Sequence, residues 1–271
     1  MLPINAMAHV QPPTAYLVGA GPGDPELLTL KALRVLRAAT VILIDDLVGE
    51  QVLHQVLEPQ ALAPRIVHVG KRGGCASTLQ DFICKLMVRE ALAGERVVRL
   101  KGGDPLVFGR AGEELAALRA AGVPVEVVNG ITSGLAAVNA LDTSWTDRHA
   151  GAQGVLLVTG HPQPGSPGPD WDAIAAVAAS GITLVVYMGV ARVDELQRGL
   201  LAALPEHTPV AVVQNASLPA QRDAVGTLGG LAELVREHGL GSPAIVVVGD
   251  VLRGLRHAAL DTQPMKHARS A

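Results

Sequence analysis

Short apolar runs rich in Val, Ile and Leu recur along the chain, and helix-length stretches separate most of them. Strands that are apolar over their whole length are typical of a parallel sheet covered by helices on both faces. The pattern therefore predicts an α/β fold with largely parallel sheet pairing. The runs are AYLVG, TVILID, RIVHVG, RVVRLK and PVEVV in the first half, then GVLLVTG, TLVVYMG, PVAVVQN and PAIVVVGD in the second.

An irregular polar stretch interrupts this pattern between Val128 and Gly154. We therefore predict an N-terminal α/β domain over 14–128, a connecting segment over 129–153 and a C-terminal α/β domain over 154–255. In the second half, PVAVVQN and RDAVGTL lie too close together for an intervening helix, so they are expected to pair antiparallel. The ends, 1–13 and 256–271, have the composition of flexible tails.

Composition excludes several classes of function. The formal net charge is −3 and only 2% of residues are aromatic, which is unfavourable for binding nucleic acid. No apolar run reaches the roughly 18 residues that a membrane helix needs, so a membrane is not an expected partner. Cys75 and Cys84 have neither metal-site nor redox-motif spacing, which favours reduced thiols, a cytoplasmic location and no metal.

Two glycine-rich loops carry the chemistry, Tyr16–Leu28 (YLVGAGPGDPELL) and Arg99–Glu114 (RLKGGDPLVFGRAGEE). Both contain Gly-Asp-Pro after an expected strand, and in open parallel sheets ligands bind beyond the carboxyl ends of the strands. The two loops can therefore border one crevice. Their acids, Asp24 and Asp104, favour a ligand that tolerates carboxylates, although Asp24 before a proline also fits a helix N-cap.

Two ligand classes compete for these loops. A dinucleotide needs glycine where Asp24 stands and backbone amides for its phosphates, and Pro22 lacks an amide; Asp45, however, lies at about the distance of a ribose-binding acid. S-adenosylmethionine has no phosphate, and its sulfonium and ammonium groups suit nearby carboxylates. The charges thus favour the methyl donor.

An ordered series of motifs spans about 15–252. The motifs are VGAGPGDPELLTLKAL (18–33), DDLV (45–48), VGKRGG (69–74), VVRLKGGDPLVFGRAGEE (97–114), NGITSGLAA (129–137), VTGH (158–161), VVYMGV (185–190), TPVAVVQNAS (208–217) and SPAIVVVGDV (242–251). A series of this kind is far more specific than one glycine motif. It resembles the tetrapyrrole methylases, most closely the members that act on uroporphyrinogen III.

The resemblance implies two α/β domains with the active site in the cleft between them, and a homodimer. It implies S-adenosylmethionine as donor, S-adenosylhomocysteine as product, and no metal. For two of the donor positions that it implies, Met188 and Ala216, packing in the protein core is the alternative interpretation. The implied donor positions are Pro22, Gly102, Gly103, Asp104, Val107, Thr132, Ser133, Met188, Ala216 and Ala244.

The implied reaction is methylation of uroporphyrinogen III at C2 and C7 to give precorrin-2, an intermediate of sirohaem and cobalamin biosynthesis. The ring must then lose a proton, and the family's proposed base and acid correspond to Asp45 and Lys71. The substrate's eight carboxylates call for a local cationic rim, for which Arg72, Arg110 and Arg148 are candidates beside Lys71. As alternatives, Asp45 is an idle strand-end acid and the cations are ordinary surface charges.

The sequence departs from the family pattern at Ile44, at Asn129, over Ser144–Arg148 and over Gln214–Ala216. Asp147, within Ser144–Arg148, would repel substrate carboxylates if it bordered the acceptor. Methylation of a later corrin intermediate is therefore an alternative activity. A non-catalytic donor-binding protein of the same fold is another, because fold alone does not fix function.

Overall fold

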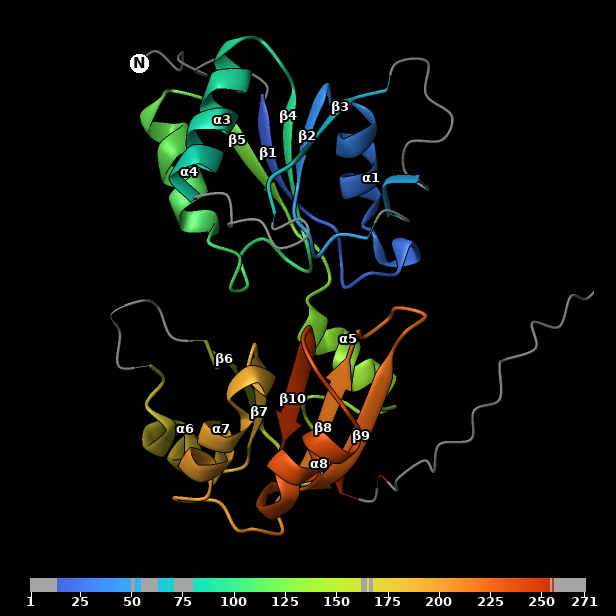
Figure 1. The fold of residues 1–271 in the computed structure, drawn as a ribbon, viewed down its shortest axis with the longest axis vertical. Coiled ribbons are helices and arrows are strands. Elements are labelled where there is room, and N and C mark those ends of the chain that lie inside the picture. The colour runs from blue at the N-terminus through green and yellow to red at the C-terminus, as the bar shows by residue number, and fades with distance from the viewer. Residues whose placement is uncertain are drawn as a thin grey trace, which may run out of the picture. The chain divides into compact units, whose positions relative to one another are not determined.

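The structure is a computed structural model that describes residues 14–49, 52–54, 63–70, 80–161, 165, 168–253 and 255. Contacts between Cα atoms divide the chain into two units, 1–137 with 215–221 and 138–214 with 222–271 (Figure 1). The division between 137 and 138 falls inside the connecting segment predicted from sequence, whereas 215–221, part of the predicted C-terminal domain, groups with the first unit. The domain limits themselves stay a prediction. The predicted tails lie outside the described residues.

The sheet of the first unit is parallel throughout and has the strand order β3-β2-β4-β1-β5. Strands β1, β2 and β4 are almost wholly buried, as their unbroken apolar sequences predict. The α/β prediction is confirmed for this half of the chain. The strands are β1 (Ala15–Gly19), β2 (Val41–Ile44), β3 (Arg65–His68), β4 (Val97–Lys101) and β5 (Val125–Val128).

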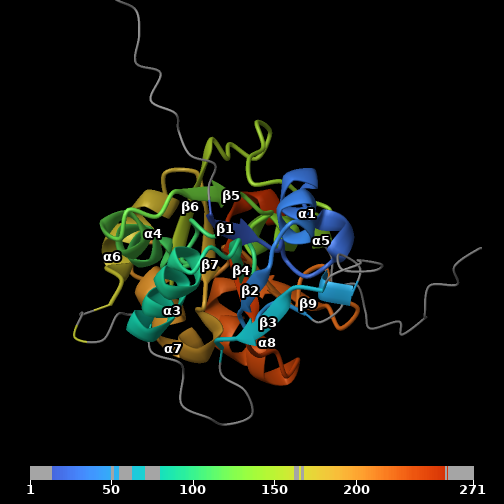
Figure 2. The same cartoon turned by 90° about the horizontal axis from the view of Figure 1, so that it is seen from above.

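Helices cover both faces of this sheet, with α1 on one side and α3 and α4 on the other (Figure 2). Val98 and Leu100 of β4 pack in the cluster that contains α1. Because side chains alternate along a strand, Arg99 and Lys101 face α3 and α4 instead. The helices of this unit within the described residues are η1 (Pro25–Leu27), α1 (Leu30–Arg37), a helical piece over 52–54, α3 (Gln80–Leu92), α4 (Ala111–Ala120) and the start of α5 (Ser133–Ala140).

The second unit has a mixed sheet with the order β6-β7-β10-β8-β9. Only β6 and β7 are parallel; β10 runs antiparallel to both of its neighbours, and β8 pairs antiparallel with β9 as predicted. The expectation of largely parallel pairing is thus wrong for this sheet, because β10 enters it from the opposite direction. The strands are β6 (Gly154–Thr159), β7 (Ile182–Tyr187), β8 (Pro209–Gln214), β9 (Arg222–Thr227) and β10 (Ala244–Val248).

One face of this sheet packs against three helices, with Leu184, Val212 and Val246 from the strands and Leu196 and Leu231 from the helices in one buried cluster. Helix α6 begins where Asp170 Oδ1 accepts a hydrogen bond from the amide of Ala173 at 3.0 Å, an ordinary N-cap. The helices are α6 (Trp171–Ala178), α7 (Val193–Leu200) and α8 (Leu231–Glu237), with short 3-10 turns η2 (Val190–Arg192), η3 (Leu228–Gly230) and η4 (Asp250–Leu252).

Candidate functional site

Three glycines pack together where β1, β4 and β5 end. A Cβ on Gly19 would lie 2.6 Å from both the Gly103 carbonyl oxygen and the Gly130 nitrogen, so only glycine fits there. Gly103 donates from its amide to the Gly21 carbonyl at 2.7 Å, and Gly21 donates back to the Gly103 carbonyl at 3.2 Å. The two Gly-Asp-Pro loops are therefore neighbours at one edge of the sheet, as parallel topology predicts.

Asp24 caps the 3-10 turn that follows it. Its Oδ1 accepts a hydrogen bond from the amide of Glu26 at 2.8 Å, and its own amide donates to Ser217 Oγ at 3.1 Å. The structure thus supports the N-cap interpretation for this acid. A side chain on Gly23 would meet Leu218 at 2.5 Å, so residues 215–221 lie directly against the first glycine loop.

Asp104 is buried and serves as an internal acceptor. Its Oδ2 accepts from the Asn129 side-chain amide and from the Gly130 backbone amide, each at 3.0 Å, and its Oδ1 accepts from Leu106 N at 2.8 Å. Three donors therefore hold this carboxylate and fix the loop around it. Asn129, one of the departures from the family pattern, has a local role as one of these donors.

The start of α5 lies beside the same loop. A Cβ on Gly103 would be 3.6 Å from Ser133 Oγ and 3.8 Å from the Ser133 amide nitrogen, and Gly103 has a positive φ of 67°. Thr132 immediately precedes the helix. Around Gly103 the loop and the start of α5 therefore present a hydroxyl and backbone groups, and Pro22 contributes no amide. These groups fit a ligand that has hydroxyl and amino groups better than one that needs a phosphate cradle.

The remaining donor candidates of the first unit border the same loops. Gly102 is half-buried, and a Cβ there would lie 3.0 Å from Leu47 Cβ. Val107 is half-buried and donates from its amide to the Asp104 carbonyl at 3.2 Å. Ala216 is buried and belongs to the segment that lies against the first glycine loop.

Two candidates lie at one edge of the second sheet. Strand register pairs Ile245 with Tyr187 and Ala244 with Gln214, so Met188, which follows Tyr187, and Ala244 share that edge. Met188 has a positive φ of 55° and is 45% exposed, so core packing does not explain it. Residues after Gln214 leave β8 from the same edge.

The two acids that follow β2 point to different neighbours. Asp45 forms an ion pair through Oδ1 with the guanidinium NH2 of Arg99, and its side chain is 26% exposed. Asp46 is exposed and lies against Gly70, where any side chain would collide with its carboxylate. Within the described residues, the buried Arg99 therefore pairs with Asp45 and not with Asp46.

Behind Asp45 lies a buried charge cluster that the sequence analysis missed. Glu114 of α4 is fully buried, and its carboxylate accepts from Arg99 Nε at 3.1 Å, from Lys101 Nζ at 2.9 and 3.0 Å and from Gln80 Nε2 at 3.2 Å. Burial and the Arg99 charge lower the pKa of Lys101, while Glu114 opposes that shift. The available signal was the pair of cations, Arg99 and Lys101, two residues apart in the otherwise apolar run VVRLK.

The predicted cationic rim is only partly described, because Lys71 and Arg72 lie outside the described residues. Arg110 is exposed and forms a two-point ion pair with Glu113, with both N–O distances 2.8 Å. Arg148 lies exposed in the turn after Asp147. The structure therefore describes two of the four predicted cations, Arg110 in the first unit and Arg148 in the second.

Asp147 organises that turn. Its Oδ1 accepts from the backbone amides of His149 at 2.7 Å and Ala150 at 3.2 Å, and these hydrogen bonds lower the pKa of the Asp147 carboxyl. The acid thus remains charged over a wider pH range than a free aspartate. Its hydrogen bonds to these two amides stabilise the turn that contains Arg148.

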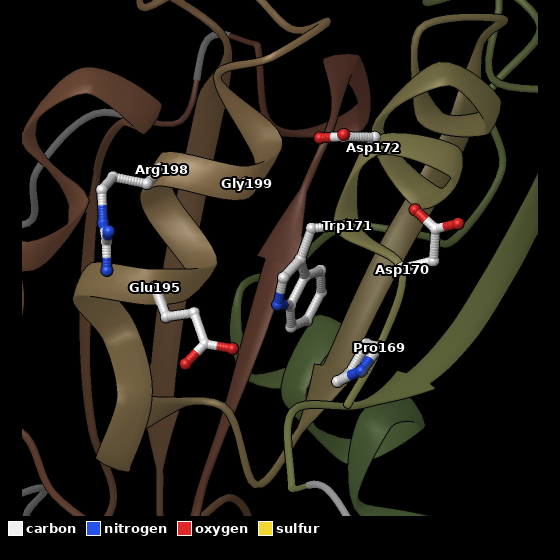
Figure 3. Close-up of a pocket in the computed structure, with 7 residues that line it drawn as sticks. All are labelled: Pro169, Asp170, Trp171, Asp172, Glu195, Arg198 and Gly199. Atoms are coloured by element: carbon white, nitrogen blue, oxygen red, sulfur yellow. The ribbon is translucent and has the colours of Figure 1, made fainter. Parts of the chain in front are cut away.

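Two cavities described in the second unit are lined by other residues than the predicted site residues. One cavity has a volume of about 400 Å³ and contains the Trp171 ring between α6 and α7. Glu195 and Arg198 lie on one side of the ring, and Asp170 and Asp172 lie on the other (Figure 3). Another, of about 540 Å³, is lined by residues that include Thr183, His207 and Gly249. No predicted site residue lines either cavity.

The described part of the chain contains neither a metal-binding group of side chains nor a membrane-spanning helix. No group of three or more His, Cys, Asp or Glu side chains is arranged there to hold a metal ion. No helix among those residues combines the length and apolar character needed to span a membrane.

Comparison with known proteins gives consistent matches. The family model of the Tetrapyrrole (Corrin/Porphyrin) Methylases matches residues 14–232. The uroporphyrinogen-III C-methyltransferase of Pseudomonas aeruginosa is 54% identical over 244 residues, 89% of this chain and 94% of that protein. A siroheme synthase of Aeromonas hydrophila is 43% identical over 237 residues, 87% of this chain and 48% of that protein. The Thermus thermophilus uroporphyrin-III C-methyltransferase complexed with S-adenyl homocysteine has a TM-score of 0.74 at 42% identity, covering 88% of this chain and 98% of that one.

Proposed function

The chain belongs to the tetrapyrrole methylases, as its motifs predict, and from this premise we propose that it is an S-adenosylmethionine-dependent C-methyltransferase. Its acceptor is uroporphyrinogen III, methylated at C2 and C7 to give precorrin-2. The observation that carries this proposal is the 54% identity to a uroporphyrinogen-III C-methyltransferase over nearly the whole of both chains. The Thermus relative, solved with S-adenyl homocysteine, supports the choice of donor.

The donor positions we propose are the loop residues named above. When bound, S-adenosylmethionine supplies an electrophilic methyl group. Gly103 leaves room for a ligand next to the hydroxyl of Ser133, and Asp104 keeps the loop in shape through its three internal hydrogen bonds. The other proposed members of this set are Pro22, Gly102, Val107, Thr132, Met188, Ala216 and Ala244.

Catalysis in this proposal requires positioning and one proton acceptor. The electron-rich pyrrole carbon of the acceptor would form the new bond to the methyl carbon while the bond between that carbon and the donor sulfur breaks and S-adenosylhomocysteine leaves; the ring would afterwards lose a proton. Asp45 is the proposed base, because its carboxylate lies at the sheet edge, partly exposed and fixed by Arg99. Lys71 is the proposed acid.

The acceptor carries eight carboxylates, so binding needs local cations on a chain whose net charge is −3. We propose Lys71, Arg72, Arg110 and Arg148 for this role. Arg110 already pairs with Glu113, and an acceptor carboxylate would have to compete with that pair.

We also propose that the protein is a homodimer and that it is located in the cytoplasm.

Anaerobic incubation with uroporphyrinogen III and S-adenosylmethionine, followed by mass analysis, tests the function. The proposal expects successive addition of two methyl groups to the tetrapyrrole and formation of S-adenosylhomocysteine. Methyl transfer only to a later corrin intermediate would contradict the acceptor assignment. Donor binding without transfer to either acceptor would indicate a non-catalytic protein.

A calorimetric titration separates the donor classes. We expect S-adenosylhomocysteine to bind and NAD to give no heat, because Pro22 removes an amide and Asp24 occupies the place of a phosphate-binding glycine. NAD binding at micromolar concentration with no heat from S-adenosylhomocysteine would reverse the assignment.

A further inference from the structure

The charged side chains behind Asp45 are almost completely buried. The side chains of Arg99, Lys101 and Glu114 are 3%, 5% and 0% exposed, between the first sheet and helices α3 and α4. Buried ion pairs are often no more stabilising than well-packed apolar side chains of similar volume. Fold stability alone is therefore a weak explanation for placing two cations and a carboxylate in an apolar core.

The cluster ends at Asp45. Arg99 donates from Nε to Glu114, from NH1 to the carbonyls of Leu43 at 3.4 Å and Leu100 at 3.3 Å, and from NH2 to Asp45 Oδ1. The guanidinium plane is thus fixed by β2, β4 and α4 together. With Asp45 and Glu114 as carboxylates and Arg99 and Lys101 as cations, the formal charges balance.

From this geometry we propose that Arg99 is a positioning residue for methyl transfer: it holds the Asp45 carboxylate at the sheet edge, and Glu114 fixes Arg99 in turn. Lys101 completes the charge balance around Glu114 and is not itself aimed at Asp45. A planar guanidinium with donors on two sides can bridge two carboxylates, which the single ammonium of lysine cannot do in the same geometry. This inference rests on the proposed function, because it assigns Arg99 a role in that reaction.

Arg99→Lys tests the proposal, with Arg65→Lys as the matched control. Arg65 pairs with Glu90, also a nearly buried carboxylate, but it lies at the start of β3, at the opposite end of the sheet from Asp45. The readouts are single-turnover methyl transfer to uroporphyrinogen III, KM for that acceptor, affinity for S-adenosylhomocysteine, and the folded fraction by circular dichroism.

We expect Arg99→Lys to lower the single-turnover rate per folded molecule roughly 10- to 100-fold, the scale of a misplaced catalytic group. KM and donor affinity should stay within about twofold of wild type, and Arg65→Lys should have the wild-type rate. In an Asp45→Asn background, Arg99→Lys should change the rate less than about twofold, because the group it positions can no longer accept a proton.

A purely structural role predicts a different pattern. A wild-type rate per folded Arg99→Lys molecule, or an equal loss in the Asp45→Asn background, would overturn the proposal. If Arg99→Lys does not fold, Glu114→Gln, which keeps the side-chain size, must show the same loss of rate with unchanged KM; a wild-type rate there would overturn it as well. If wild type itself fails to methylate uroporphyrinogen III, the proposed function is what has failed.

Discussion

At the scale of single residues, the structure separates neighbours that look equivalent in sequence. Asp45 and Asp46 are adjacent acids, yet only Asp45 reaches the buried Arg99, whereas Asp46 lies against Gly70. Alternation of side chains at a strand end predicts that the two differ, but it does not predict which cation one of them meets. That partner depends on the pairing of β2 with β4, which places Leu43 opposite Arg99 and which the order of strands along the chain does not reveal.

We predict that Asp45→Asn lowers turnover by roughly two to four orders of magnitude, while Asp46→Asn has little effect. Asparagine keeps the shape of the side chain but cannot accept the proton, so donor affinity should not change. Single-turnover assays of both variants, with calorimetry of S-adenosylhomocysteine binding, measure this. Full activity of Asp45→Asn would remove it as the base, and equal losses in both variants would indicate a folding defect.

At the scale of elements, the apolar runs predicted the strands well because burial on both faces leaves a clear signal. The apolar pattern did not reveal that β10 is antiparallel to β7 and β8, because the sequence of a buried central strand is equally apolar in parallel and in antiparallel pairing. The N-cap at Asp24 was recognisable from Asp-Pro, whereas its contact with Ser217 joins residues 193 positions apart and depends on tertiary packing.

The close approach of Gly19, Gly103 and Gly130 predicts a strong size limit at the sheet edge. Gly130→Ala would put a methyl group against the Gly103 carbonyl and the Gly19 backbone, so we expect a loss of about 1 to 3 kcal/mol in stability and weaker donor binding. Gly112→Ala in α4 is the control, because nothing lies within 4 Å of its added Cβ. Urea unfolding compares the two variants, and equal stability of Gly130→Ala and wild type would refute the close contact.

Glu90 of α3 pairs with Arg65 of β3 and with Arg89 of its own helix, and these ion pairs predict a pH dependence of stability. Hydrogen bonding from Arg89 and the charge and hydrogen bond of Arg65 lower the pKa of Glu90 below its ordinary value of 4.5. A lowered folded-state pKa gives stability that is present above 4.5 and is lost as the pH falls through the folded value. Wild type should therefore exceed Glu90→Gln in unfolding free energy at neutral pH, with the difference shrinking in acid. A constant difference from pH 7 to acid would contradict this.

At the scale of the whole molecule, the two α/β units correspond to what the motifs imply, and the family follows from motifs spread over both. We predict a homodimer on the family resemblance, because closed two-fold assemblies are the commonest for soluble proteins and no sequence patch marks the interface. Light scattering at micromolar concentration measures the mass, and a monomer would refute the prediction.

Nuclear magnetic resonance of the product shows whether the protein methylates carbon atoms of uroporphyrinogen III. With a donor carrying a carbon-13 methyl group, we expect two labelled methyl groups on saturated ring carbons, at C2 and C7 of the tetrapyrrole. A label on an oxygen or nitrogen atom, a label at other ring positions, or an unlabelled macrocycle after complete incubation with folded, donor-binding protein would contradict it.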